Sequence, residues 1–135
     1  KSTVEGLLGS TKAASEIIRG KALVNPSAAT VTIDEEDTSV DIANGYAAAT
    51  SSGIANALDI STDWSTEVAA SGWTGNSSVQ EDDLVIFPNE LTLTDDGSSD
   101  PECYVVYRGA VAADSSATPA VSFAKPVIQA VTSGC

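Results

Sequence analysis

Histidine is absent from the 135 residues, and so is methionine. Without histidine, catalysis by a Ser-His-Asp triad or a Cys-His pair is excluded. The sequence also contains no Walker A motif and no Gly-x-Gly-x-x-Gly motif. The many carboxylates are scattered through predicted loops, so they do not single out the acidic pair of a glycosidase. We therefore expect a protein that is not an enzyme and that has no cofactor and no metal centre.

Basic residues are scarce. Six Lys and Arg residues against nineteen Asp and Glu residues give a formal net charge of −13. Such a surface repels phosphate backbones and anionic lipids, so neither nucleic acid nor a membrane surface is an expected partner. The hydrophobic fraction of 42% predicts a folded chain rather than a disordered one. No apolar run reaches the 18 residues typical of a membrane span.

The two cysteines are Cys103 and Cys135, and the second stands at the end of the sequence. They are either two unrelated thiols or the halves of one disulfide. A bridge would hold a chain end that otherwise frays, and it would place the protein in an oxidising compartment. We therefore expect a Cys103–Cys135 disulfide, worth roughly 3–4 kcal/mol in the chain-entropy description. Oxidised cysteines leave neither a thiolate nucleophile nor a zinc–thiolate site.

The segment from Ser2 to Gly20 has the periodicity of an amphipathic helix, and the rest of the fold is expected to be organised around it. A turn of about 100° per residue gathers its apolar residues on one face and its charged residues on the other. The face expected to lie against the core includes Val4, Leu7, Leu8 and Ile18. Glu5 and Lys12 lie on the opposite face.

The ends of this helix are less well defined by the sequence. Ser2 and Glu5 fit a capping box, whereas the alternative is a longer helix that starts before Lys1. Gly20 is the expected end, and a short extension to Val24 before Asn25-Pro26 is the other possibility.

The remaining sequence predicts loops first and strands later. Residues 23–83 are expected to be mainly loop, and they include four local features: a strand at Thr30–Asp34, a turn at Asn44-Gly45, a short helix after Thr50 capped by Ser51 or Ser52, and an irregular connection from Ser61 to Asn76.

From residue 84 onward the sequence predicts strands, because apolar or alternating runs stand at Leu84–Phe87, Leu91–Thr94, Cys103–Arg108 and Val127–Thr132. A short extended piece is expected at Ser122-Phe123 and a turn at Asp95–Gly97. Strands this close together pair antiparallel. The prediction is one α+β domain, with a helix over 1–22, a loop region over 23–83 and an antiparallel sheet over 84–135.

Three polar or aromatic features are candidate sites. Asp34 to Asp37 is interpreted as a solvated loop rather than a metal site. The segment from Asp95 to Asp100 is rich in oxygen ligands but lacks EF-hand spacing, so an ordinary polar turn is favoured over weak Ca²⁺ binding. Trp64 and Trp73 are expected to cover the edge of the core, and exposed ligand-binding aromatics are the alternative.

Several segments together resemble the globular part of a type IV pilin. The stretch KSTVEGLLGSTKAASEIIRGKAL resembles the C-terminal half of the pilin spine helix. The stretch DIANGYAAATSSGIANALDISTDW is similar to the loop after that helix in pilins of the mannose-sensitive haemagglutinin type. The section from Glu102-Cys103-Tyr104 to Ser133-Gly134-Cys135 resembles the family's disulfide-bounded C-terminal region. The family's leader-peptidase site and apolar N-terminal segment are not in this sequence, and Glu5 is not the family's glutamate near the processed end.

The resemblance implies a pilin fold and a structural role. The chain would be a truncated pilin, most similar to a major pilin, although a minor pilin or a secretion pseudopilin stays open. Its partners would be other pilin subunits, joined through the missing helix, and host or abiotic surfaces. It would act in attachment, motility or biofilm formation in an extracellular filament on the cell surface, with a full-length precursor in the inner membrane. Assembly contacts are expected from Glu5 and Lys12, and from Arg108 or Lys125 against an acidic loop such as Asp34 to Asp37. The rival function is a glycan-binding or adhesin module that uses Trp64 and Trp73.

Overall fold

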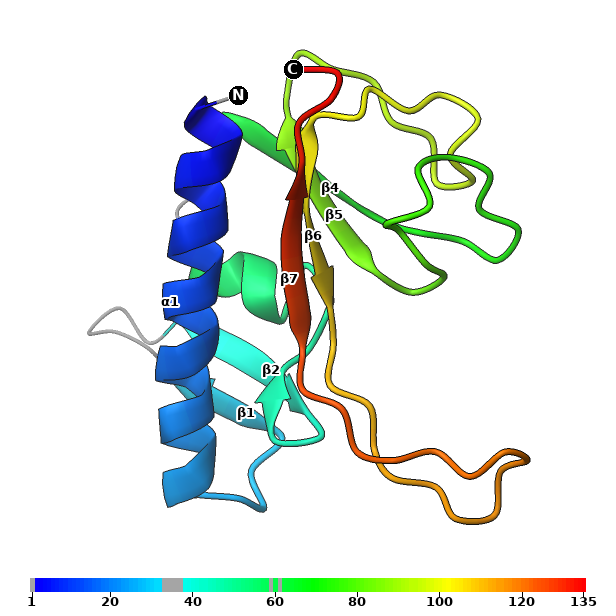
Figure 1. Ribbon diagram of the computed structural model, residues 1–135. Coiled ribbons are helices and arrows are strands. Elements are labelled where there is room, and N and C mark those ends of the chain that lie inside the picture. Colours follow the sequence, from blue (N-terminus) through cyan, green and yellow to red (C-terminus); the bar gives the residue numbers. More distant parts are fainter. Residues whose placement is uncertain (1, 33–37, 59, 61) are drawn as a thin grey trace.

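The computed structural model describes residues 2–32, 38–58, 60 and 62–135. Helix α1 (Ser2–Val24) runs along one side of the molecule, and two antiparallel sheets lie beside it (Figure 1). One sheet has the order β1 (Thr30–Thr32), β2 (Ser39–Ala43) and β3 (Tyr46–Ala47). The other has the order β4 (Trp64–Val68), β5 (Leu84–Pro88), β6 (Tyr104–Arg108) and β7 (Val127–Val131). The predicted α+β class and antiparallel pairing are confirmed.

Helix α1 continues through Gly20 to Val24, which is the longer of the two predicted ends. A glycine inside a helix costs about 1 kcal/mol relative to alanine, but burial of the next core-facing residue, Ala22, favours continuation. The buried face follows helical spacing and consists of Val4, Leu7, Thr11, Ser15, Ile18 and Ala22. The Thr11 hydroxyl donates to the Leu7 carbonyl at 2.8 Å, so this buried polar group is paired. Leu8 lies at the margin of the face and is only partly buried.

Leu7 and Leu8 offer a matched test of which helix face supports the domain. Replacing Leu7 with alanine is expected to lower the free energy of unfolding by roughly 2–3 kcal/mol, because a buried leucine leaves a cavity. Leu7 is 8% exposed, which places the loss in the lower part of the usual range. The same change at Leu8 is expected to cost about 1 kcal/mol, since its side chain already contacts solvent. Urea unfolding of both variants measures the difference, and equal losses would contradict the orientation of α1.

The loop region predicted for residues 23–83 contains more regular structure than expected. The Asn44-Gly45 turn is confirmed: its two residues have φ angles of 54° and 80°, as a type I′ hairpin turn requires, and it joins β2 to β3. Strands β2 and β3 were missed because they are short and mixed in polarity. The predicted strand at Thr30–Asp34 is found as β1, and Ile33 and Asp34 lie outside the described residues.

Two further predictions for this region were wrong. The stretch Ser61–Asn76 contains β4, which pairs with β5 along its whole length. Its sequence, WSTEV, lacks apolar alternation because this strand lies at the sheet edge and is mostly half-buried. The predicted short helix is found as η1 (Ile54–Ala57), a single 3₁₀ turn. Its N-cap is Gly53, which makes no side-chain hydrogen bond, so the predicted serine cap was wrong.

The predicted C-terminal strands correspond to β5, β6 and β7, whereas no strand forms at Leu91–Thr94. Pro88 ends β5, and the Leu91 amide donates to the Pro88 carbonyl at 3.0 Å, so the chain turns there. The Asp95–Gly97 turn is confirmed, with Gly97 at a φ of 77°. The extended piece near Phe123 forms isolated bridges, Val111 with Ala124 and Asp114 with Val121.

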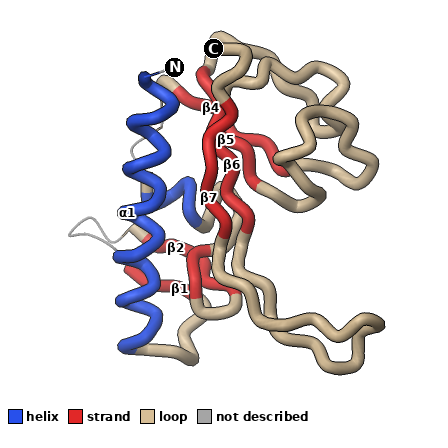
Figure 2. Tube along the Cα trace, viewed as in Figure 1, coloured by secondary structure: helices blue, strands red, loops and turns tan. Residues whose placement is uncertain are grey.

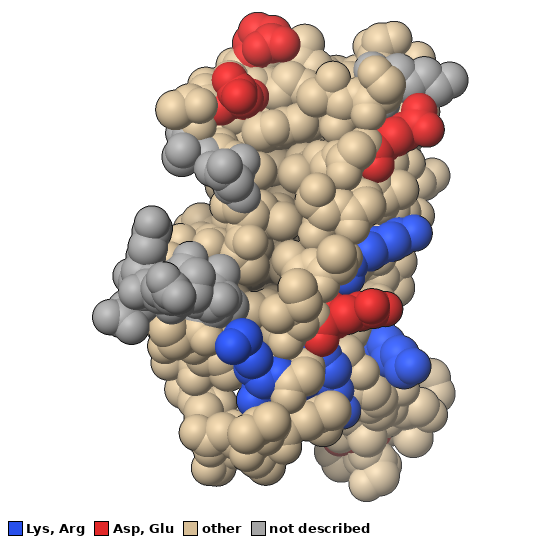
Figure 3. All heavy atoms as spheres, turned by 90° about the vertical axis from the view of Figure 1, so that its left-hand side faces the viewer, with Lys and Arg blue, Asp and Glu red and all other residues tan. Residues whose placement is uncertain are grey.

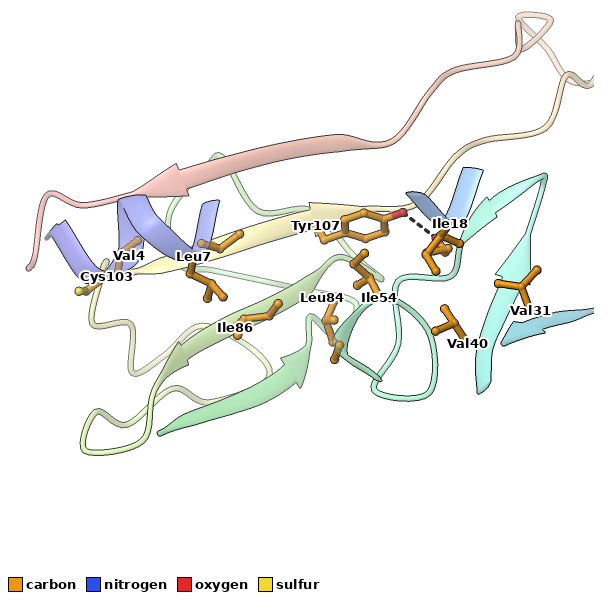
Figure 4. Packing of buried hydrophobic residues seen from close by; sticks show 13 residues of the cluster. Val4, Leu7, Ile18, Val31, Val40, Ile54, Leu84, Ile86, Cys103 and Tyr107 are labelled. Carbon is orange, nitrogen blue, oxygen red and sulfur yellow. Dashed lines mark hydrogen bonds between the residues drawn. The ribbon is translucent and has the colours of Figure 1, made fainter. Parts of the chain in front are cut away.

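The four-stranded sheet is covered on both faces, which explains the continuous apolar runs of β5 and β6. Alternate side chains of these strands enter two clusters. The cluster toward α1 contains Leu84, Ile86, Val105 and Tyr107 together with Val4, Leu7, Ile18 and Ile54 (Figure 4). The cluster on the other face contains Val85, Phe87, Tyr104, Val106 and Val131. Loops cover that second face, on the side away from α1 (Figure 2).

Tyr107 joins the two sheets through the core. Its hydroxyl donates to the Ala47 carbonyl of β3 at 2.7 Å, and the residue has no exposed surface (Figure 4). Burial raises the pKa of Tyr107 from its ordinary 10.0 to about 12. Burial and the neighbouring Asp100 carboxylate raise the pKa of Tyr104 as well.

These tyrosines predict a loss of stability at alkaline pH. The unfolded chain ionises its tyrosines near pH 10, whereas the folded chain keeps Tyr107 protonated, so the stabilisation is complete below pH 10 and is lost as the pH rises through about 12. For Tyr107 alone the difference corresponds to roughly 3 kcal/mol. Urea unfolding across this range is expected to show a smaller alkaline loss in Tyr107→Phe. Tyr46→Phe is the matched control, and an unchanged profile in Tyr107→Phe would contradict the assignment.

The predicted Cys103–Cys135 disulfide is confirmed, with a Cα–Cα distance of 4.9 Å. It joins the residue before β6 to the chain end after β7, across a sequence separation of 32. The bridge lies beside the first turn of α1, since Thr3 and Val4 line the same hollow as both cysteines. The disulfide therefore anchors the C-terminal end next to the start of the helix.

Candidate functional site

The outward face of α1 is the first candidate surface. Glu5 and Lys12 are exposed there, as the helical periodicity predicts. The helix also exposes apolar side chains, with Ile17 at 58% and Leu23 at 60%. Seen from this side, Lys and Arg side chains gather over the C-terminal half of the helix (Figure 3).

Part of this basic region is a groove of about 470 Å³, which we call the basic groove. It is bordered by α1, by β3 and by the chain entering β7. Its residues are Lys12, Ser15, Glu16, Arg19, Tyr46, Lys125, Pro126 and Ile128. The structure therefore brings together two of the predicted assembly residues, Lys12 and Lys125, from the two ends of the chain.

Arg19 and Tyr46 are fixed in one wall of the basic groove. The Arg19 Nη1 group donates to the Gly45 carbonyl at 2.9 Å, and its guanidinium carbon lies 4.4 Å from the centre of the Tyr46 ring. The Tyr46 ring in turn stacks on Phe123, with centroids 6.1 Å apart. The φ of +80° at Gly45 favours glycine, and a Cβ atom there would lie 2.5 Å from Arg19 Nη1, so a larger residue would displace the guanidinium. Sequence reasoning missed this wall because no local pattern pairs a helix residue with a distant hairpin.

Arg108 lies elsewhere and is already paired within its own chain. Its Nη2 atom is 2.9 Å from Asp83 Oδ2, its Nε donates to Asp83 Oδ1 at 3.0 Å, and Nη2 also donates to the Ser78 carbonyl at 3.2 Å. Asp83 is 1% exposed and the Arg108 side chain is 25% exposed. This buried pair gives Arg108 a structural role that sequence analysis did not find. The acidic loop Asp34 to Asp37, its expected partner on another subunit, lies outside the described residues.

The two tryptophans do not share one binding platform. Trp64 of β4 packs against the cluster beneath α1, whereas Trp73 packs against the cluster on the opposite face of the sheet. The Trp73 indole N–H donates to the Asn76 carbonyl at 3.0 Å. Both side chains are half-buried, which fits the prediction that they cover core edges.

The oxygen-rich segment at 95–100 is an ordered polar turn. The Asp96 carboxylate accepts from the Ser98 amide at 2.9 Å, and hydrogen bonds from the Ser98 amide and hydroxyl lower the pKa of Asp96. Asp100 accepts from the Asn76 amide at 2.7 Å and from the Tyr104 hydroxyl at 3.0 Å. Within the described ranges, no three acidic, histidine or cysteine side chains come together as a set of metal ligands.

Comparisons with models of known protein families, with curated proteins and with solved structures found no match. Among the described residues, no helix has both the length and the apolar character needed to cross a membrane.

Proposed function

We propose that this chain is the globular part of a structural subunit of a type IV pilus, similar to the mannose-sensitive haemagglutinin type of major pilin. The filament lies on the cell surface and serves attachment, motility or biofilm formation. The observation that carries the proposal is the layout around α1. One face of this 23-residue helix is buried against both sheets, while its other face remains exposed along its length.

The exposed face of α1 is suited to contacts between subunits. Ile17 and Leu23 remain more than half exposed on it, and a neighbouring subunit would remove that apolar surface from water. The sheet loops project on the side away from α1 (Figure 1). Such a subunit can place α1 toward the filament axis and its loops toward the surroundings.

The structural role fits this domain better than the rival glycan-binding role. Sugar-binding platforms present aromatic faces together, and here Trp64 and Trp73 belong to separate clusters. A minor pilin or a secretion pseudopilin would use the same layout. These subunit types differ in how much of the filament they make up, so the abundance of this chain in isolated filaments separates them.

The proposal requires an apolar helical segment encoded ahead of Lys1, and this can be tested directly. The upstream coding region is sequenced, and the full chain is then expressed in a bacterium that lacks its own pili. Surface filaments labelled by an antibody against the domain are expected under the electron microscope. The matched control lacks only the upstream segment, and it should give folded, exported domain without filaments. A full chain that is exported and folded but never labels a filament would overturn the proposal.

A further inference from the structure

We propose that the basic groove binds the acidic turn of a second copy of this chain, through Lys12, Arg19 and Lys125 on one copy and Asp95 and Asp96 on the other. The inference deepens the proposed filament function and rests on it for its biological meaning. The contact itself is a property of the domain.

The distribution of cations singles out the groove. Lys1 lies outside the described residues, and Arg108 is occupied by Asp83. Three of the four remaining basic residues line the basic groove, and Lys21 lies outside it. Within the described residues, the Arg108–Asp83 contact is the one salt bridge, so the Lys12 and Lys125 ammonium groups form no ion pair with another described residue.

The groove is prepared for a carboxylate partner. Glu16 is the one acidic residue among the described residues that line it, and Tyr46, Pro126 and Ile128 give it apolar walls that weaken solvent screening. Arg19 is held over Tyr46 and against the Gly45 carbonyl, so little of its side-chain freedom remains to be lost on binding. In a chain with a net charge of −13, a concentration of positive charge of this kind favours an acidic ligand.

A second copy carries a suitable acidic ligand at its own turn. Asp95 and Asp96 are both exposed, and the turn is held by the Thr94 amide donating to the Ser99 carbonyl at 3.0 Å and by the Gly97 amide donating to the Thr94 carbonyl at 3.1 Å. A turn ordered before binding loses little entropy when it docks. Glu81 and Asp82 are a second exposed acidic pair, and they border a different hollow together with Asp83 and Arg108.

The groove and the turn lie on different sides of the molecule. The groove is formed against α1, whereas the loop that carries Asp95 and Asp96 projects on the far side of the four-stranded sheet (Figure 1). Two complementary surfaces on opposite sides of one chain give a head-to-tail contact, which repeats into an open assembly instead of closing as a two-fold dimer. This geometry is the one a filament subunit needs.

The test measures self-association of the isolated domain by sedimentation velocity at millimolar concentration. Low salt, about 0.01 M, keeps electrostatic contacts effective over roughly 30 Å. The groove variant is Lys12→Gln/Lys125→Gln, with Lys21→Gln as its control. The turn variant is Asp95→Asn/Asp96→Asn, with Glu81→Gln/Asp82→Asn as its control. The groove variant and the turn variant are each expected to weaken self-association by roughly 2- to 30-fold, as the loss of two exposed charge pairs implies. The Lys21→Gln control is expected to associate like the wild type, and the Glu81→Gln/Asp82→Asn control like the wild type or more strongly.

The turn variant separates this contact from general charge repulsion. It reduces the net charge from −13 to −11, so repulsion alone predicts stronger association, whereas the proposed contact predicts weaker association.

Mixing the groove variant with the turn variant gives the decisive result. Each is impaired alone, but the intact groove of the turn variant can bind the intact turn of the groove variant. A one-to-one complex that grows no further is expected. Absence of that complex, or an equal loss in the controls, would overturn the proposal, as would groove binding of an acidic glycan in place of the turn. Formation of the complex by a chain that makes no filaments would leave the contact standing and remove the filament function. Normal filaments from the full chain that carries the groove substitutions would show the opposite: the filament function would stand, and the proposed contact would not be needed for assembly.

Discussion

Replacing Arg108 with alanine is expected to lower the free energy of unfolding by roughly 3–5 kcal/mol, because the buried Asp83 carboxylate would lose its partner. Asp83 is 1% exposed, and Arg108 contacts both of its carboxylate oxygens. The pair also holds the segment before β5 against the end of β6, since Arg108 donates to the Ser78 carbonyl. Urea unfolding at neutral pH measures the loss.

Lys125→Ala is the matched control for this change. Lys125 is an exposed basic residue that takes part in no salt bridge with another described residue, so its replacement is expected to change stability by less than about 0.5 kcal/mol. A double variant, Asp83→Leu/Arg108→Met, is expected to recover much of the loss, because no unpaired charge then remains buried. Equal stability of Arg108→Ala and Lys125→Ala would show that the pair contributes nothing. Because Arg108 supports the fold, its removal is not a clean test of assembly.

Opening the Cys103–Cys135 disulfide is expected to cost roughly 4 kcal/mol. The bridge closes a loop with a sequence separation of 32. Without the bridge the unfolded chain has more conformational entropy, and in the chain-entropy description this lowers the free energy of unfolding by about that amount. Unfolding of the wild type with and without reductant gives the loss directly. The region after β6, which includes β7, is expected to become the first site of proteolysis in the reduced protein, because β7 pairs with β6 alone.

The Cys103→Ala/Cys135→Ala variant is the control for effects of the reductant itself. It is expected to match the reduced wild type and to respond to reductant no further. A reduced wild type as stable as the oxidised one would contradict the expected contribution of the bridge.

The parts of the fold that the sequence predicts well are those in which burial dictates residue type. The spacing of Val4, Leu7 and Ile18 defines the buried face of α1, and the apolar runs of β5 and β6 reflect a sheet covered on both faces. Strand β4 escaped prediction because an edge strand that is only half-buried accepts serine, threonine and glutamate. The Leu91–Thr94 alternation misled because Leu93 belongs to a loop that packs onto the second face of the sheet, so its burial does not require a strand.

The candidate site was predictable only in fragments. The outward position of Lys12 follows from helical periodicity, and a chain with two cysteines allows a single pairing. The basic groove brings together Lys12, Arg19 and Lys125 because the β6–β7 connection returns beside α1. No local sequence pattern encodes that return. The pairing of Arg108 with Asp83 has the same origin, because β5 and β6 must first lie in register.

The connection between β6 and β7 is a long arm that projects away from the body of the molecule (Figure 1). Its two sides are joined by backbone bridges, and the outer bridge links Asp114 to Val121. Residues 115–120 therefore form a tip whose ends are already held together, so an inserted peptide there adds chain without moving either strand. A short epitope or a fluorophore-binding tag at this tip would be carried clear of the basic groove and the acidic turn. The arm thus offers an attachment point from which single molecules of this protein can be followed in living cells.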